Sequence, residues 1–335
     1  MEISVGPARL VAQITGHESI NGTADKYGVH ATDLGIMWDD ETGRTFVVFG
    51  DTYGQGWCGN GAGPSHGSDW RCNFLAIAAD RDLDTGLRIA SVVARDDGHA
   101  RQILDRDPRR DEETVIPCAG VAIDGTHYLH YMSVRAWGTQ GRWVTNYAGI
   151  AVSTDGGATW EKPERSRWIN RAEHDHPFQM GAFALGADYL YLLGTPNGRW
   201  GGASLARVAR DQVLDPHAYD YWTGSGWYPR DPFRAVAVMQ GPVAELSVVY
   251  NVHFGQWLAV HLDEARAAIV LRTAPELTGP WSEPRVLTSG AEFPGLYGGF
   301  LHPDSANGAV IHYAMSRWEP YNVYLVRNEL TRSPG

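Results

Sequence analysis

Two aspartates bracket one short predicted hairpin close to the N-terminus. In "ATDLGIMWDDETGRTFVVFGDTYG", residues 31–54, two apolar and β-branched runs flank a polar turn, so we expect strands over Leu34–Trp38 and Thr45–Phe49. Asp33 stands just before the first strand and Asp51 just after the second, which places both carboxyl groups at one end of the hairpin. Glycoside hydrolysis needs such a pair, because one carboxyl gives a proton to the leaving oxygen while the other activates water or attacks the anomeric carbon. A single Asp at a strand end is usually a turn or cap residue, so it is the pair that favours catalysis.

Four polar residues beside apolar strand starts are candidates for substrate binding. Asn73 in "WRCNFLA", and His176 and Gln179 in "HDHPFQMGAF", carry groups that suit hydrogen bonds to hydroxyls. Glu245 enters the apolar run "AELSVVYN", an environment that raises a carboxyl pKa, and a structural role for this acid is an equal alternative. Five aromatic residues could stack against sugar rings or belong to the core: Tyr53, Trp57, Trp70, Tyr297 and Trp318.

No cofactor and no metal ion is expected. His174 and His176 alternate in "EHDHP", but two histidines without a third well-placed ligand do not make a zinc site. Nothing in the sequence supports calcium in a central channel. Cys58 and Cys72 are close enough in sequence to bridge across a loop, leaving Cys118 alone, and three free thiols are the equal alternative.

The elements that must position these residues are strands, joined by tight turns along the whole chain. The sequence holds 39 Gly, 13 Trp and 15 Tyr, a mixture that suits many short strands. Such spacing is typical of a sandwich or of a β-propeller, whose blades are four-stranded sheets of roughly 40–50 residues. Two motifs favour an all-β propeller of five to seven blades. In "STDGGATW" (153–160), an Asp-box, Asp155 closes a hairpin turn over Trp160, and "LTGPWSEP" (277–284) resembles an outer-blade turn; both are assigned to structure.

Composition and charge argue against several classes of protein. The chain of 335 residues is 43% hydrophobic and 20% charged, which is ordinary for a globular protein. Its net charge of −11 argues against nucleic-acid binding, because neutralising phosphates needs clustered Lys and Arg. No run of about 18 apolar residues predicts a membrane span, so no membrane partner is expected. The opening "MEISVGPARL" lacks the basic and apolar segments of a signal peptide, so either the protein acts in the cytoplasm or the sequence begins at the mature end.

With the motifs "TDLGIMWDD", "FVVFGDTYG", "WRCNFLA", "GPWSEP" and "YGGFLHP", the chain resembles glycoside hydrolase family 183, endo-D-arabinanases of an actinobacterial DUF4185-type domain. The resemblance covers about residues 25–328, and the first two motifs are its specific part. It implies a five-bladed β-propeller, a single domain over 1–335, that cuts internal α-linkages between D-arabinofuranose units of mycobacterial arabinogalactan and lipoarabinomannan. The TDLG and FGDT motifs carry that family's catalytic carboxylates, here Asp33 and Asp51. The resemblance also implies a secreted protein. We favour inversion, since no distinct nucleophile motif is present, and a monomer is the default.

Other functions remain open from the sequence. An L-arabinan hydrolase or a sialidase would share the propeller, but sialidases use an arginine cluster, and here one Asp-box and no early Arg motif occur. A catalytically inactive lectin would bind arabinan through Asp33 and Asp51 without cleaving it. A scaffold that binds proteins on its rim would have no affinity for glycans.

Overall fold

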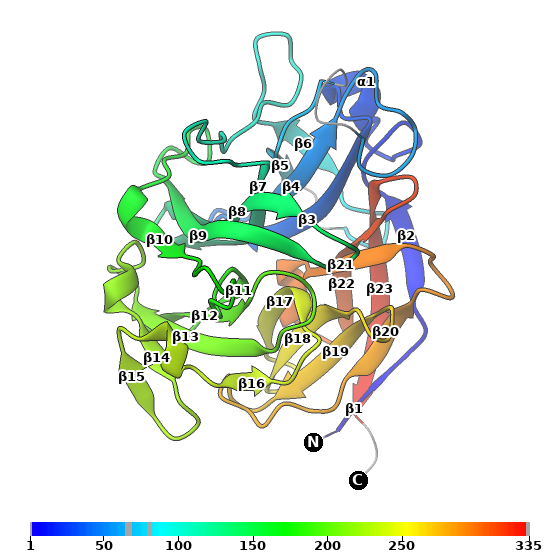
Figure 1. The fold of residues 1–335 in the computed structure, drawn as a ribbon. Coiled ribbons are helices and arrows are strands. Elements are labelled where there is room, and N and C mark those ends of the chain that lie inside the picture. Colours follow the sequence, from blue (N-terminus) through cyan, green and yellow to red (C-terminus); the bar gives the residue numbers. More distant parts are fainter. Residues whose placement is uncertain (1, 64–68, 79–81, 333–335) are drawn as a thin grey trace.

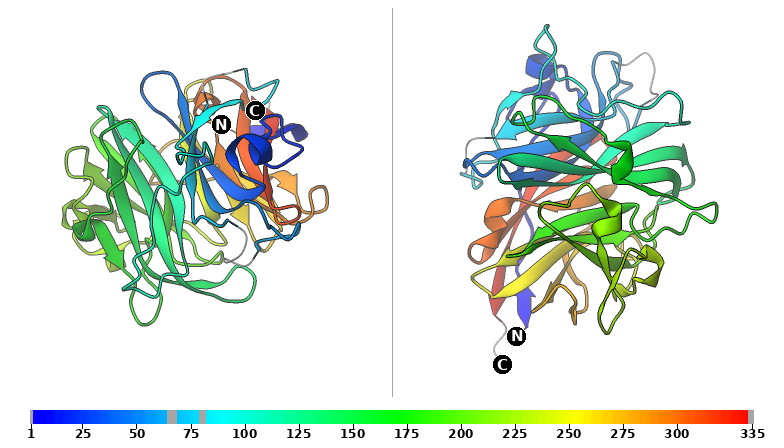
Figure 2. Two further views of the ribbon diagram at one scale, coloured as in Figure 1. Left: turned by 90° about the horizontal axis from the view of Figure 1, so that it is seen from above. Right: turned by 90° about the vertical axis from the view of Figure 1, so that its left-hand side faces the viewer.

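The computed structural model describes residues 2–63, 69–78 and 82–332, and it forms an all-β, five-bladed propeller as expected (Figure 1, Figure 2). Each blade is an antiparallel sheet whose strands follow one another in chain order. Blade 1 contains β3 (Ala31–Asp39), β4 (Thr45–Tyr53), β5 (Phe74–Ala78) and β6 (Ile89–Val92). Blade 2 contains β7 (Thr114–Ile123), β8 (Thr126–Trp137), β9 (Trp143–Ser153) and β10 (Arg167–Ile169).

Blade 3 is the most elaborated of the five sheets. It contains β11 (Met180–Leu185), β12 (Tyr189–Thr195), β13 (Ala203–Ala209), β14 (Asp220–Trp222) and β15 (Trp227–Pro229), and β16 (Ala237–Met239) pairs with β13. Blade 4 contains β17 (Ala244–Asn251), β18 (Gln256–Asp263), β19 (Ala268–Ala274) and β20 (Arg285–Ser289). Blade 5 contains β21 (Leu296–Leu301), β22 (Val310–Arg317) and β23 (Asn322–Arg332).

The two ends of the chain close the ring within blade 5. The N-terminal strands β1 (Ile3–Val5) and β2 (Arg9–Gln13) both pair with β23, so that Ile3 faces Arg332 (Figure 1). A sheet built from the first and last strands fixes the first blade against the last. Within the described residues, helix is limited to α1 (Thr23–Tyr27) and four 3₁₀ turns over Glu164–Ser166, Pro216–Ala218, Pro232–Arg234 and Pro303–Ala306. In the described part of the chain, no helix has the length and apolar character needed to span a membrane.

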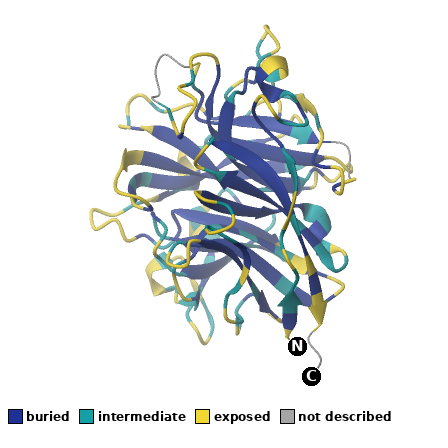
Figure 3. Ribbon diagram, turned by 90° about the vertical axis from the view of Figure 1, so that its right-hand side faces the viewer, coloured by how far each residue is buried: buried dark blue, intermediate teal, exposed yellow. Residues whose placement is uncertain are grey.

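The first strand of each blade lies nearest the axis, where β3, β7, β11, β17 and β21 contact one another in a ring. Buried residues dominate the strands and exposed residues the connecting loops (Figure 3). A cavity of about 40 Å³ lies among the inner strands, and each inner strand contributes an apolar side chain to its lining: Leu34, Ile116, Met180, Leu246 and Phe300. The polar residues Thr195 and Glu245 also line this cavity.

The Asp-box has the structural role expected from its sequence. The Asp155 carboxylate accepts hydrogen bonds from the backbone nitrogen and the hydroxyl of Thr159, at 2.9 and 2.6 Å. The indole of Trp160 donates to the Gly157 carbonyl at 3.0 Å and lies edge-on to Trp38. The structure shows three free cysteines and no Cys58–Cys72 disulfide. Cys58 is exposed, whereas Cys72 and Cys118 are buried.

Candidate functional site

A cavity of about 950 Å³ opens at the end of the propeller where the inner strands begin. Its floor consists of residues at the starts of the inner strands, together with Asp51 on β4. Its rim consists of the connections between the second and third strands of the blades. All five blades contribute to the lining, which includes Asp33, Asp51, Tyr53, Trp70, Thr114, Trp137, Trp143, Arg199, Glu245, Glu264, Tyr297, Trp318 and Tyr321.

Asp33 and Asp51 are neighbours on the paired strands β3 and β4. Thr32 faces Thr52 and Leu34 faces Phe49, so the irregular register between these pairs sets Asp33 against Gly50 and Asp51. A Cβ atom added to Gly50 would lie 2.3 Å from Oδ1 of Asp33, so only glycine fits there. The two aspartates therefore lie within the strands, not just outside them as predicted. The ladder continues past a β-bulge at Leu34 and Gly35, whose positive φ angles of 69° and 87° the apolar pattern does not reveal.

Asp33 is partly buried beside two tyrosines. Tyr297 donates from its hydroxyl to Oδ2 of Asp33 at 3.0 Å, while Oδ1 has no hydrogen-bond partner among the described residues. Burial raises the pKa of Asp33 to about 7 and the negative charge of Glu245 adds to the shift, while the hydroxyls of Tyr321 and Tyr297 and the charge of Arg199 oppose it. Oδ2 of Asp33 is thus held by a tyrosine hydroxyl, while Oδ1 is enclosed by the protein next to Gly50.

Asp51 is held through a single carboxylate oxygen. The Thr114 hydroxyl donates to Oδ1 at 2.7 Å and the Trp70 indole donates to the same atom at 3.2 Å. Burial raises the pKa of Asp51 to about 8 and the nearby negative charge of Asp33 adds to the shift, while those two hydrogen bonds oppose it. Because two adjacent carboxylates do not both ionise easily in a buried site, the pair retains a proton near neutral pH.

A second group of charged residues in the cavity comes from blades 3 and 4. Arg199, in the connection after β12, donates from Nε and Nη2 to Oε1 of Glu245 at 2.8 and 2.7 Å. Its Nη1 lies 3.4 Å from Oε2 of Glu264. Oε2 of Glu245 is buried and has no hydrogen-bond partner in the described part of the chain. Burial raises the pKa of Glu245 against the opposing charge of Arg199. Glu245, one of the binding candidates from the sequence, lines the cavity.

The aromatic candidates divide between the cavity and the loops. Tyr53, Trp70, Tyr297 and Trp318 line the cavity. Trp57 is not among the lining residues; its indole donates to the Gly61 carbonyl at 3.0 Å within its own loop.

Three polar candidates lie away from the cavity, and their assignment to substrate binding is corrected. Asn73 makes four hydrogen bonds that fix backbone groups of Ile103, Leu104 and Val115. Gln179 accepts from the Thr145 hydroxyl at 2.6 Å and donates to the Trp168 carbonyl at 3.0 Å. His176 accepts from the backbone nitrogen of Phe178 at 3.2 Å and packs edge-on against Phe233. A polar side chain beside a strand start often satisfies the backbone of the adjoining loop.

Sequence reasoning missed several lining residues. Thr114 and Tyr321 reach the two aspartates, and Arg199 pairs with Glu245. Arg199 stands alone in "NGRWGG", and nothing local links it to acids far along the chain. Among the described residues, no three His, Cys, Asp or Glu side chains are grouped as metal ligands.

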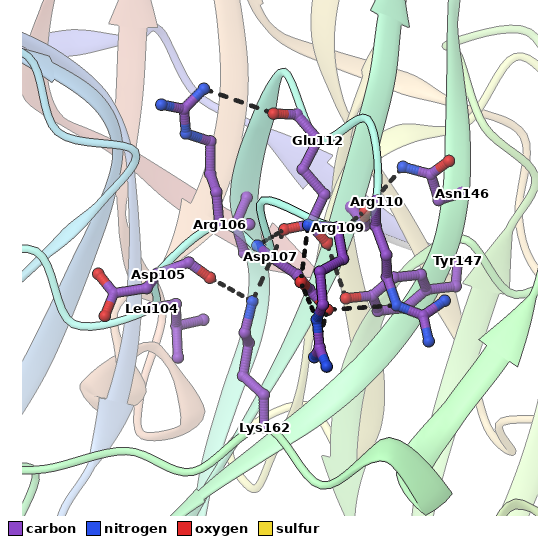
Figure 4. A network of polar contacts seen from close by, with 12 residues as sticks. Leu104, Asp105, Arg106, Asp107, Arg109, Arg110, Glu112, Asn146, Tyr147 and Lys162 are labelled. Atoms are coloured by element: carbon purple, nitrogen blue, oxygen red, sulfur yellow. Dashed lines mark hydrogen bonds and ion pairs between the residues drawn. The ribbon is translucent and has the colours of Figure 1, made fainter.

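A buried glutamate fastens the loop that leads to Thr114 (Figure 4). Oε1 of Glu112 accepts from the Ser133 hydroxyl at 2.8 Å and from the Tyr147 hydroxyl at 2.7 Å. Its Oε2 accepts from the backbone nitrogen of Asp107 and lies 3.9 Å from Nζ of Lys162. The loop is thereby tied to β8 and β9, which places the following strand β7, and with it Thr114, against Asp51.

Comparison with known families gives a match over most of the chain. The family model described as "Domain of unknown function (DUF4185)" matches residues 18–327. "Notoamide biosynthesis cluster protein J" of Aspergillus sp. (strain MF297-2) is 31% identical over 313 residues, which cover 88% of this chain and 81% of that protein. "Notoamide biosynthesis cluster protein J'" of Aspergillus versicolor is 32% identical over 310 residues, covering 88% and 82%.

Several solved structures share the fold. A putative hydrolase from Bacteroides ovatus ATCC 8483 superposes with a TM-score of 0.62 and 12% identity, over 91% of this chain and 87% of that chain. An exo-beta-1,3-galactanase from Phanerochaete chrysosporium superposes with a TM-score of 0.56 and 11% identity, over 98% of this chain and 64% of that chain. Zg3597, a family 117 glycoside hydrolase from Zobellia galactanivorans, superposes with a TM-score of 0.54 and 13% identity, over 97% of this chain and 90% of that chain. At these identities the similarity shows a common propeller fold.

The raised carboxyl pKa values make stability depend on pH. A carboxyl whose pKa is higher in the folded chain stabilises the fold fully below its ordinary pKa of 3.8, and loses that contribution as pH rises through about 7 for Asp33 and about 8 for Asp51. We therefore expect Asp33→Asn and Asp51→Asn, which cannot ionise, to unfold at higher urea concentration than the wild type at about pH 9. The advantage should shrink toward about pH 4.5.

The control is Asp124→Asn at an exposed turn, which should follow the wild type at both pH values. A difference between wild type and the two site variants that does not change with pH would contradict the burial of ionisable carboxyls at this site.

The Glu112 network gives a second expectation. Glu112→Gln keeps the shape but turns a donor toward the backbone nitrogen of Asp107 and removes the charge near Lys162. The free energy of unfolding should fall by about 1–3 kcal/mol, as for a buried polar group left without its partner. Glu164→Gln, whose side chain is 68% exposed, should change it by less than about 0.5 kcal/mol. Equal urea midpoints for the two variants would show that the buried carboxylate does not fasten the loop.

Proposed function

This chain belongs to the family described as DUF4185, and from that premise we propose that it is a glycoside hydrolase that cleaves internal α-D-arabinofuranosidic linkages of D-arabinan. The observation that carries the proposal is the adjacent pair of the partly buried Asp33 and the buried Asp51 on the floor of a cavity of about 950 Å³. Two carboxyl groups that share one proton near neutral pH supply the acid and the base that glycosidic cleavage needs. The cavity is large enough for more than one sugar unit.

The surroundings of the two carboxyls support different roles. Asp51 has the higher pKa, about 8, and we assign it as the acid that protonates the leaving oxygen. Asp33, with a pKa of about 7 and the opposing charge of Arg199 nearby, is assigned as the base. No distinct nucleophile motif is present in the sequence, so we expect direct attack by water and inversion at the anomeric carbon.

The charge of the cavity favours a neutral sugar over an anionic one. Five acidic residues and two basic ones line it: Asp33, Asp51, Glu113, Glu245, Glu264, Arg142 and Arg199. Arg199 is engaged by Glu245 and Glu264, so it is not free to hold a substrate carboxylate as a sialidase arginine would.

The choice of D-arabinan rests on the sequence resemblance. The motifs "TDLG" and "FGDT", which carry Asp33 and Asp51, are those that resemble the endo-D-arabinanases of glycoside hydrolase family 183. We expect action outside the cell on mycobacterial arabinogalactan and lipoarabinomannan, by a monomer that uses no cofactor.

A second candidate follows from the Aspergillus relatives, whose printed names place them in a biosynthesis cluster. Under this alternative the cavity takes a small biosynthetic molecule instead of a polysaccharide. A third candidate is a lectin that binds arabinan without cleaving it. Activity on D-arabinan separates the leading proposal from both.

The test is digestion of purified mycobacterial arabinogalactan, with product sizes followed by chromatography. The wild type should release oligosaccharides of several lengths from D-arabinan and none from L-arabinan. Asp33→Asn and Asp51→Asn should each lose about 10²–10⁴-fold in rate, since each removes one partner of the acid–base pair. Asp124→Asn should retain full activity, and proton NMR of the first product should show the inverted anomer.

Two results would reject the proposal in different ways. Binding of D-arabinan by the wild type without new reducing ends would make the protein a lectin. Full cleavage by both Asp variants would move the chemistry away from the hairpin carboxyls.

A further inference from the structure

Two half-exposed tryptophans line the cavity on the rim. Trp137, at the end of β8, is 50% exposed, and Trp318, in the connection between β22 and β23, is 49% exposed. Because about half of each tryptophan side chain is exposed, that half does not contribute to packing in the protein core. They are the side chains whose flat faces stack against sugar rings.

Each of these tryptophans is held edge-on by a second aromatic ring. Trp137 lies 5.8 Å from Trp143 with an angle of 66° between their planes. Trp318 lies 5.7 Å from Tyr321 at 87°, and Gly61 packs so closely against it that an added Cβ would lie 2.9 Å from its Nε1. A ring fixed in this way loses little freedom when a ligand stacks on it.

The order of the blades puts the carboxyl pair between the two tryptophans. The inner strand of blade 1, β3, contacts β21 of blade 5 on one side and β7 of blade 2 on the other. Trp318 belongs to blade 5, Trp137 belongs to blade 2, and Asp33 and Asp51 belong to blade 1. A chain of sugars that passes over the carboxyls therefore meets one tryptophan on each side.

Resting on the proposed function, we propose that Trp318 and Trp137 are stacking platforms for sugar units on opposite sides of the bond that is cleaved. The platforms select a substrate that extends in both directions from that bond, which is an internal segment of a polysaccharide. Trp137 is a binding residue that the sequence analysis did not identify.

The experiment compares Trp318→Ala and Trp137→Ala with the wild type on a series of D-arabinan oligosaccharides labelled at the reducing end. Each variant should lose about tenfold in kcat/KM on the longest oligosaccharides, mainly through KM, and less on the shortest substrate that is cleaved. The preferred cut should move toward one end of the chain in one variant and toward the other end in the other, because each retains a single platform.

Tyr250→Ala is the matched control. Tyr250 is 42% exposed and is held edge-on by Trp257 at 5.3 Å, like the two tryptophans, but it lies near the far end of β17 and does not line the cavity. This variant should keep the wild-type rates and cut positions. Urea unfolding of all three variants checks that the fold is retained.

A readout that does not need catalysis separates failure of this inference from failure of the proposed function. In affinity electrophoresis through gels containing D-arabinan, the wild type should be retarded and each Trp variant retarded less. Unchanged retardation and unchanged cut positions in both variants would overturn the platforms while leaving the hydrolase intact. A shift of the cut in the same direction in both would overturn their placement on opposite sides.

Discussion

The raised pKa values of the two carboxyl groups on blade 1 depend on how the blades surround them. Burial is the largest cause of the raised pKa for both Asp33 and Asp51. The groups that surround them come from several blades, with Thr114 on blade 2, Glu245 on blade 4 and Tyr297 on blade 5. With both carboxyls fully hydrated, their pKa values would approach the ordinary value and both groups would ionise near neutral pH. The proton that the pair retains is thus a property of the ring of blades and not of one hairpin.

Local irregularities turn the floor side chains toward the cavity. The register shifts near the floor residues in three inner strands, β3, β17 and β21. Two of these irregular stretches carry Asp33 and Glu245, each with a buried carboxylate oxygen that has no partner in the described chain. A positive φ of 40° at Glu245 and of 69° at Leu34 costs free energy, as does burying unpaired oxygens. Strand pairing elsewhere in the blades, including the closure by β1 and β2, must offset that cost.

The fold could be predicted from the sequence because each blade repeats the same local pattern. Asp33, Asp51, Tyr53 and Trp70 were identified because they lie in or near a single hairpin, where distance along the chain approximates distance in space. Arg199 and Glu264 were not, because their partners lie in other blades and no local signal connects them. In the sequence, Asn73 and Gln179 resemble ligand-binding residues, yet the side chains of both are engaged in hydrogen bonds within the protein. A polar residue at a strand start can either face a ligand site or hydrogen-bond to a neighbouring loop, and only the arrangement of that loop decides between the two.

The floor and the rim of the cavity come from different parts of each blade. Residues of the inner strands supply most of the floor, with Asp33, Thr114, Glu245 and Tyr297 coming from four different blades. The connections between second and third strands supply the rim, among them those that carry Trp70, Arg199 and Trp318. Inner strands are constrained by packing around the axis, whereas the connections can vary in length and sequence without disturbing it. A propeller can therefore keep one arrangement of floor carboxyls while the rim changes which molecule reaches them. In this chain, the rim residues Trp137 and Trp318 belong to the two blades adjacent to the one that carries the floor carboxyls, so the order of the blades sets where rim and floor residues lie relative to one another.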